Sequence, residues 1–333
     1  MATITTEDRI TSLENKLRQI ASIAMQDGQS IPPSAIVPPG AAQRATAAVS
    51  EEPEIYVAQA GARLALAVGA APAAGAPYTI EVRFLGGLTQ NQKDAFRAAA
   101  DRWTRVIVGS LPPVVVEGET IRGVLILAQG AIIDGPGKIL GQAGPTRLRP
   151  ANAGQAAFIP AKGEMMFDSA DLADMETRGT LRDVITHEMG HVIGIGTIWS
   201  HKSLLNGAGT NNPMFIGPNA TREYGVLRGT GPTSVPVENT GGQGTADSHW
   251  RDTVFGNELM TGFVGSAGNP LSRMTVASLQ DMGYGVNLGA AEPYQLPSHL
   301  AIAEGAALAG LNELELGTML PHIPMVLPPS SLQ

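Results

Sequence analysis

The alternation of apolar and polar positions predicts a series of strands and helices through the middle of the chain. Apolar and polar side chains alternate over residues 78–84, which predicts a half-buried strand. Thr89 and Gln92 have the spacing of a capping box, and the helix that follows carries apolar residues on one face. Two further apolar runs, at 113–116 and 124–128, also predict strands. This order favours an α+β fold with a mixed sheet.

The pattern is less regular over residues 135–183. Residues 135–145 are rich in glycine and predict a turn, and residues 164–167 predict a short strand. Thr180 and Asp183 have the spacing of a second capping box, which predicts the start of another helix.

Both ends of the chain differ from the middle. Residues 7–25 show heptad spacing over about two repeats, which fits a surface helix or a small helix for weak self-association. We expect ordered structure to begin near Pro77, with one possible short element at 55–68. The expected division is an N-terminal amphipathic helix at 1–28, an Ala/Pro/Gly-rich linker or pro-segment at 29–76, the main domain at 77–290 and a proline-containing tail at 291–333.

Composition removes several classes of function. The net charge is −8 and there is no basic block, so we expect no nucleic-acid partner. The chain has no cysteine, which excludes disulfides, thiolate metal ligands and a cysteine nucleophile. The N-terminus lacks the features of a secretory signal, and no run approaches the ~18 apolar residues that a membrane span requires. The compartment stays open.

The central chemical feature is the run from His187 through Glu188 to His191. Helix positions i and i+4 share one face and lie about 6 Å apart along the axis, so both imidazoles can reach one ion. Imidazole suits zinc, which takes three protein ligands and a water at catalytic sites. Glu188 can accept a proton from that water. The alternative is a surface helix with two incidental histidines.

The motif alone leaves the third ligand open. His299 and His322 lie in the proline-rich tail, where we expect exposure to solvent, and His201 lies in a polar loop. His249 lies shortly before a glycine-bracketed segment that contains Glu258. Glu258 is itself a rival ligand.

The run from His187 to Gly194 resembles the HExxHxxG core of the metzincins. Most metzincins carry the third ligand three residues after that glycine, where this chain has Thr197. The leishmanolysin-like branch has a long insertion before its third histidine. Here His249 comes far downstream, and residues 258–262 are similar to the Met-turn of that branch. Residues 271–284 are similar to its closing helix.

The resemblance implies a metzincin-like α+β domain with a twisted mixed sheet, an active-site helix and an irregular C-terminal subdomain. It implies that His187, His191 and His249 bind zinc and that Glu188 is the general base. It also implies that Met260 forms a hydrophobic floor beneath the metal, a place where a thioether packs well.

The predicted function is therefore a zinc-dependent endopeptidase with residues 77–290 as its catalytic domain and a protein or peptide as its substrate. By the resemblance, residues 164–167 are the edge strand with which an extended peptide pairs, and a plain interior strand is an equal alternative. Two other functions stay open: a non-catalytic adhesion or binding module on this scaffold, and a zinc hydrolase of a non-peptide substrate. The intact Glu188 argues against the first of these.

Overall fold

The computed structural model describes residues 53–61, 77–242, 244–262, 267–298 and 318–333. These residues belong to one compact unit, Pro53–Gln333. The helix expected at 1–28 and most of the linker expected at 29–76 lie outside the described residues, and the division of the chain into four parts stays a prediction.

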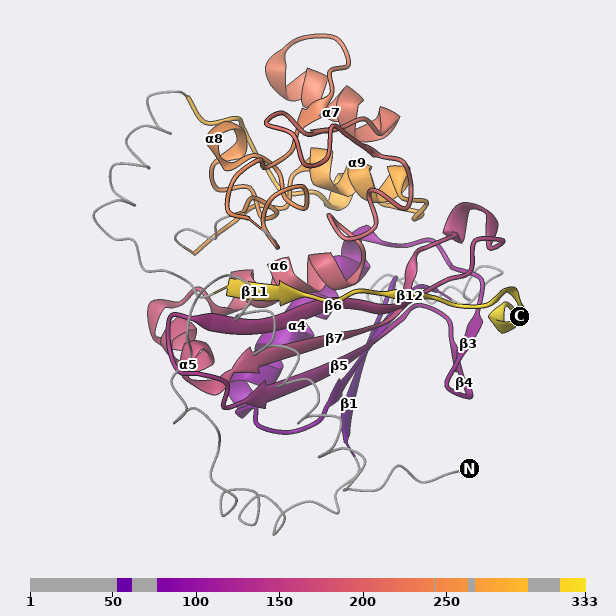
Figure 1. The fold of residues 1–333 in the computed structure, drawn as a ribbon, viewed down its shortest axis with the longest axis vertical. Coiled ribbons are helices and arrows are strands. Elements are labelled where there is room, and N and C mark those ends of the chain that lie inside the picture. Colours follow the sequence, from indigo (N-terminus) through magenta and orange to yellow (C-terminus); the bar gives the residue numbers. More distant parts are fainter. Residues whose placement is uncertain (1–52, 62–76, 243, 263–266, 299–317) are drawn as a thin grey trace. The chain divides into compact units, whose positions relative to one another are not determined.

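A mixed sheet of seven strands is the largest element of the described residues (Figure 1). Its strand order is β1-β2-β5-β7-β6-β11, and β12 also pairs with β6. The β1–β2 and β6–β7 pairs are antiparallel, and the other neighbours are parallel. The strands are β1 (Glu54–Gln59), β2 (Thr79–Phe84), β5 (Val124–Ala131), β6 (Ile139–Leu148), β7 (Pro160–Asp168), β11 (Thr318–Pro321) and β12 (Met325–Val326).

Six α-helices and several short strands complete the described fold. The helices are α4 (Gln90–Val106), α5 (Ser169–Arg178), α6 (Leu181–Val192), α7 (Pro218–Arg228), α8 (Asp252–Phe255) and α9 (Arg273–Asp281). The short strands are β3 (Val114–Val116), β4 (Glu119–Ile121), β8 (Leu205–Asn206), β9 (Met214–Phe215) and β10 (Val235–Pro236). The predicted α+β class with a mixed sheet is confirmed.

Local sequence signals account for the elements around α4. The capping box is formed, since Thr89 Oγ1 accepts from Gln92 N and Gln92 Oε1 accepts from Thr89 N. In β2 every second side chain is buried, as the alternation predicts. The strands predicted at 113–116 and 124–128 are also present.

The turn predicted at 135–145 is wrong from Ile139 onward, because β6 is a ten-residue strand. Its glycines permit close pairing rather than a turn. A Cβ atom on Gly141 would lie 2.0 Å from the Met166 carbonyl oxygen, so no other residue fits this register. The register of β6 against β7 shifts between Pro145 and Leu148, which marks an irregularity and not the end of the strand.

The predicted edge strand at 164–167 is also wrong, and the interior alternative is confirmed. These residues lie in β7, which pairs with β5 on one side and with β6 on the other. The next strand outward, β6, pairs on its outer side with β11 and β12. β11 and β12 therefore form the edge on this side of the sheet, and β6 lies one strand inward.

Segments outside the expected main domain add strands at both sides of the sheet. β1 lies upstream of Pro77 and pairs over its whole length with β2. β11 and β12 lie in the tail, whose described part packs on the domain. No helix among the described residues is long and apolar enough to cross a membrane.

The second capping box is not formed. Thr180 occupies the N-cap of α6, but its side chain makes no capping hydrogen bond there. Asp183 instead accepts a hydrogen bond from Gly268 N and lies 3.6 Å from the Arg102 guanidinium. The Asp183 carboxylate thus interacts with residues far away in the sequence and not with the backbone at the start of α6, as the capping box had predicted.

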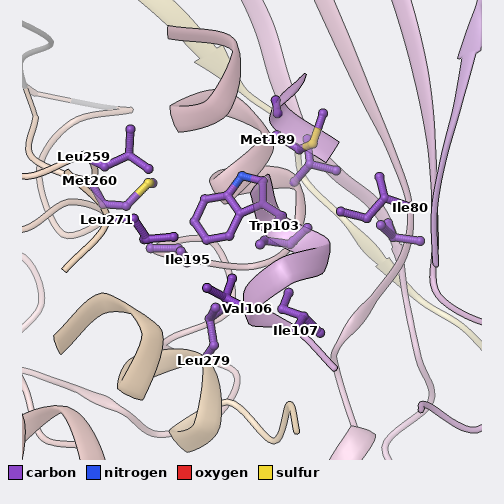
Figure 2. Close-up of a cluster of buried hydrophobic side chains, with 14 of the residues drawn as sticks. Ile80, Trp103, Val106, Ile107, Met189, Ile195, Leu259, Met260, Leu271 and Leu279 are labelled. Atoms are coloured by element: carbon purple, nitrogen blue, oxygen red, sulfur yellow. The ribbon is translucent and has the colours of Figure 1, made fainter. Parts of the chain in front are cut away.

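Helix α4 connects the sheet to the motif-bearing helix α6. It packs against β1 and β2, while α6 packs against β6 and β7. Trp103 is fully buried between them, and its Nε1 donates a hydrogen bond to the Thr186 carbonyl oxygen, 2.9 Å away. Figure 2 shows the indole surrounded by apolar side chains from α4, α6 and the C-terminal segments.

This position of Trp103 generates a stability prediction. Trp103→Phe removes a buried hydrogen bond and leaves a small cavity, and we expect it to lower the free energy of unfolding by about 1–3 kcal/mol. Urea unfolding measures the change. Val226→Ala, at a side chain that is 69% exposed, is the control and should lie near zero. Equal effects from both variants would contradict the role given to the indole.

Candidate metal centre

Helix α6 and a distant loop bring three histidines together in the described part of the chain. His187 and His191 lie one turn apart on α6, and His249 reaches them from the loop before α8. The three Nε2 atoms are separated by 3.0, 3.0 and 2.9 Å, and all three side chains are buried. No other group of histidines and carboxylates among the described residues has a geometry that could hold a metal ion.

Each of these rings is oriented by a backbone carbonyl oxygen. The Nδ1 atom of every ring lies 2.7–2.9 Å from such an oxygen. The carbonyl partners are Leu259 for His187, Ile195 for His191 and Thr245 for His249. A carbonyl oxygen only accepts hydrogen bonds, so Nδ1 carries the proton of each neutral ring. The Nε2 atoms therefore present lone pairs to one another.

Burial keeps the three rings in the neutral form that a metal requires. It lowers the pKa of His187 to about 3 and that of His191 to about 4. Burial, and then the neighbouring histidines, also hold the pKa of His249 well below its usual value. Three unprotonated nitrogens at this spacing repel one another, and a cation bound at about 2.0–2.1 Å from each would resolve the repulsion. The donor set fits a metal ion.

Glu188 lies beside His187 on α6 and is buried. Burial raises the pKa of this carboxyl to about 8. A cation at the histidine nitrogens would oppose that shift, because a nearby positive charge favours the ionised carboxylate. The pKa of Glu188 therefore depends on whether a cation is bound at the three histidines.

The segment that carries His249 is fixed by contacts on both sides. Glu238 N donates to the His249 carbonyl oxygen, and Trp250 N donates to that of Met260, each at 2.9 Å. A Cβ atom on Gly196 would lie 2.0 Å from the Ser248 carbonyl oxygen, so the chain after α6 approaches this segment as only glycine can. These contacts place the third ring opposite the pair on α6.

Met260 packs directly beneath the motif helix. A Cβ atom on Gly190 would lie 2.7 Å from the Met260 sulfur and 3.0 Å from the Trp103 ring. Figure 2 shows Met260 and Trp103 within one apolar cluster. The glycine between Met189 and His191 therefore makes room for the thioether, and the role of Met260 as a floor beneath the metal stays a prediction.

Glu258 is not part of the histidine group, so the rival-ligand hypothesis is wrong. Its buried carboxylate accepts hydrogen bonds from Met260 N at 2.6 Å and from Ser272 N at 3.1 Å. It also accepts from the hydroxyls of Ser272 and Thr275, in the first turn of α9. Glu258 thus ties the turn that contains Met260 to the start of the closing helix. The spacing of polar residues along the sequence did not reveal this role.

The remaining histidines lie away from the group. The His201 ring packs against Phe158, and the His322 side chain lies 4.0 Å from the Glu164 carboxylate. His299 lies outside the described residues. The carbonyl partners of the three central rings escaped the sequence reasoning as well, because every residue type carries the same backbone carbonyl.

Comparison with known families agrees with this geometry. The family model described as leishmanolysin, Peptidase_M8, matches residues 155–301. The matched range contains α6, the loop with His249, the turn with Met260, and α9. A search of curated proteins found no match. The family match supports a metal-dependent peptidase, which is a hydrolase.

The convergence of the three rings predicts that metal binding requires His249. His249→Ala should weaken zinc binding by at least about 100-fold, since removal of a supporting group alone costs 10–100-fold in other sites. Elemental analysis and chelator competition measure the change. His201→Ala is the matched control and should retain the metal. Equal metal content in the two variants would exclude His249 as a ligand.

The Glu258 network predicts a separate effect on stability. Glu258→Gln replaces one accepting oxygen by an amide nitrogen, which cannot accept from the donors that it faces, either Met260 N or the groups of Ser272 and Thr275. We therefore expect a loss of about 1–3 kcal/mol in unfolding free energy. Urea unfolding of the metal-loaded protein measures it. Glu119→Gln, which removes an exposed ion pair with Arg83, should cost less than about 1 kcal/mol. Unchanged stability in Glu258→Gln would show that the network contributes nothing.

Proposed function

We propose that this leishmanolysin-like metallopeptidase is a zinc-dependent endopeptidase in which His187, His191 and His249 bind the metal and Glu188 is the general base. The observation that carries the proposal is the convergence of three unprotonated Nε2 atoms, two of them from the helix that also carries the buried Glu188. A family model of metallopeptidases matches the same part of the chain.

Zinc is the metal that this donor set favours. Three neutral imidazoles form a nitrogen-only set, which disfavours calcium and magnesium because those ions prefer oxygen ligands. Catalytic zinc commonly takes three protein ligands and leaves a fourth position open. With no cysteine in the chain, thiolate-based sites are excluded.

The protein's own groups provide the orientation and the proton transfer. When bound, zinc lowers the pKa of a coordinated water to roughly 7 and polarises a carbonyl oxygen. The backbone carbonyls of Leu259, Ile195 and Thr245 keep the three Nε2 lone pairs directed at one point. Glu188 takes up the proton of the attacking water and delivers it to the leaving amine nitrogen. Its buried surroundings favour the protonated form between these two steps.

A peptide substrate is favoured over a non-peptide one by the backbone pairing of β6. On its outer side β6 pairs in parallel with the short C-terminal strands β11 and β12, and the same backbone groups would pair with an extended peptide that replaced them. A purely adhesive module has no need of a carboxyl group beside the metal ligands. Cleavage of casein with and without a chelator separates an enzyme from a binding module, and a peptide library separates peptide from non-peptide hydrolysis.

Glu188→Gln tests the assigned base. We expect the variant to retain zinc and to lose at least about 100-fold in the rate of casein cleavage, because the amide cannot accept the proton. Glu176→Gln, on helix α5, is a matched control that should keep full activity. Cleavage at the wild-type rate by zinc-loaded Glu188→Gln would exclude the general-base role.

A further inference from the structure

The C-terminal segment lies along the strand where the proposed function places a peptide. β11 and β12 run parallel to β6, with Met319 opposite Gly141 and Met325 opposite Arg147. Figure 1 shows both, in yellow, following β6 on the side of the sheet that faces α6 and the C-terminal helices. The pairing is between backbones, so it is of the kind that any extended peptide can form.

The same segment also contacts the loop that leads to His249. A Cβ atom on Gly244 would lie 2.9 Å from the Met319 carbonyl oxygen. Gly244 is held to this loop because its carbonyl oxygen accepts a hydrogen bond from Ser248 Oγ at 3.0 Å. The segment therefore passes between the rim of the sheet and the loop that carries the third histidine.

Further contacts hold the segment on the sheet side. Gln142 Nε2 donates to the Pro321 carbonyl oxygen at 3.3 Å. A Cβ atom on Gly144 would lie 3.4 Å from the Cβ of His322, so β6 presents its backbone closely to the segment. Beyond β12, Leu327 and Leu332 pack on the small apolar cluster beneath β3 and β4. This packing anchors the end of the chain away from the histidines.

The pairing of the segment with β6 is short. Prolines at 321 and 324 lie within or just after β11 and separate it from β12, so the ladder consists of two short pieces. Met319 is half-buried against the main core, whereas the Ile323 side chain is 92% exposed. A short ladder with few buried apolar contacts opens at low cost in free energy. Its anchor nevertheless keeps it close to β6, at a high effective concentration.

We propose that residues 318–326 are an inhibitory strap, a strand of this chain that occupies the outer edge of β6 and that a peptide substrate must displace. The proposal rests on the proposed function, because it gives that site its regulation. The outer edge of β6 fits an extended peptide that pairs through its backbone and places an apolar side chain where Met319 lies. The strap lowers the apparent affinity for substrate in proportion to the fraction of molecules in which this edge is free.

The affinity of a peptide for an inactive variant of the protein tests the strap without relying on activity. The probe is a fluorescent synthetic peptide with the sequence of residues 318–326, added to the full-length, zinc-loaded Glu188→Gln protein. Adding Met319→Asp places a charge at the half-buried contact, and we expect the probe to bind about 10-fold more tightly. Adding Ile323→Asp instead puts the same charge in the same segment at an exposed position, and the affinity should stay unchanged.

Hydrogen exchange gives a second measurement on the unmodified tail. Saturating probe should increase exchange at the amides of residues 318–326 while those of β6 stay protected, because one strand replaces another. Equal probe affinity with and without Met319→Asp, together with unchanged exchange in the tail, would overturn the strap and leave β11 as a purely structural strand.

Failure of the proposed function has a different signature. In that case zinc-loaded wild type and Met319→Asp both leave casein intact, while probe affinity and tail exchange still decide whether the strap exists. If the proposed function holds, Met319→Asp cleaves casein several-fold faster than the wild type at low substrate concentration, and Ile323→Asp does not.

Discussion

Three imidazole nitrogens without protons must be held within about 3 Å of one another, and the surrounding structure is arranged to do this. Neutral rings with free Nε2 atoms would turn apart in solution, because their lone pairs repel and water offers each a hydrogen bond. Here each ring is buried, and each Nδ1 proton is taken by one carbonyl oxygen. Burial and these carbonyl contacts thus fix the three rings with their Nε2 atoms directed at one point, the arrangement that a bound cation requires.

The carbonyl groups that orient the rings are themselves fixed by packing. Leu259 and Met260 share one turn, which Glu258 joins to the first turn of α9 through a buried carboxylate. Met260 packs against Gly190 on the motif helix, and Trp103 supports that helix from α4. The contacts of Met260 with Gly190 and of Trp103 with Thr186 join residues at least 70 positions apart, so the geometry of the centre depends on the whole domain and not on the motif alone.

This dependence explains which features the sequence could predict. The i, i+4 histidines, the Thr89 cap and the alternation in β2 are local patterns, and the structure contains the helix, cap and strand that they predict. The turn predicted at 135–145 failed at Gly141 because glycine occurs in turns and also in closely paired strands. Only the position of the partner strand decides between the two.

Two other local patterns failed for a related reason. Asp183 had the spacing of a cap, but Arg102 and Gly268 compete for its carboxylate from distant parts of the chain. The position of residues 164–167 in the sheet depended on where β6, β11 and β12 would pair, and no local pattern carries that information. Without β11 and β12, the outer side of β6 would be an unpaired strand edge, and such an edge can pair with other protein chains. In the proposed strap, two short strands of the same chain, separated by prolines and anchored beyond their end, cover β6 and allow a peptide to replace them. The prolines limit the length of each paired piece, and this short pairing is what makes the cover reversible.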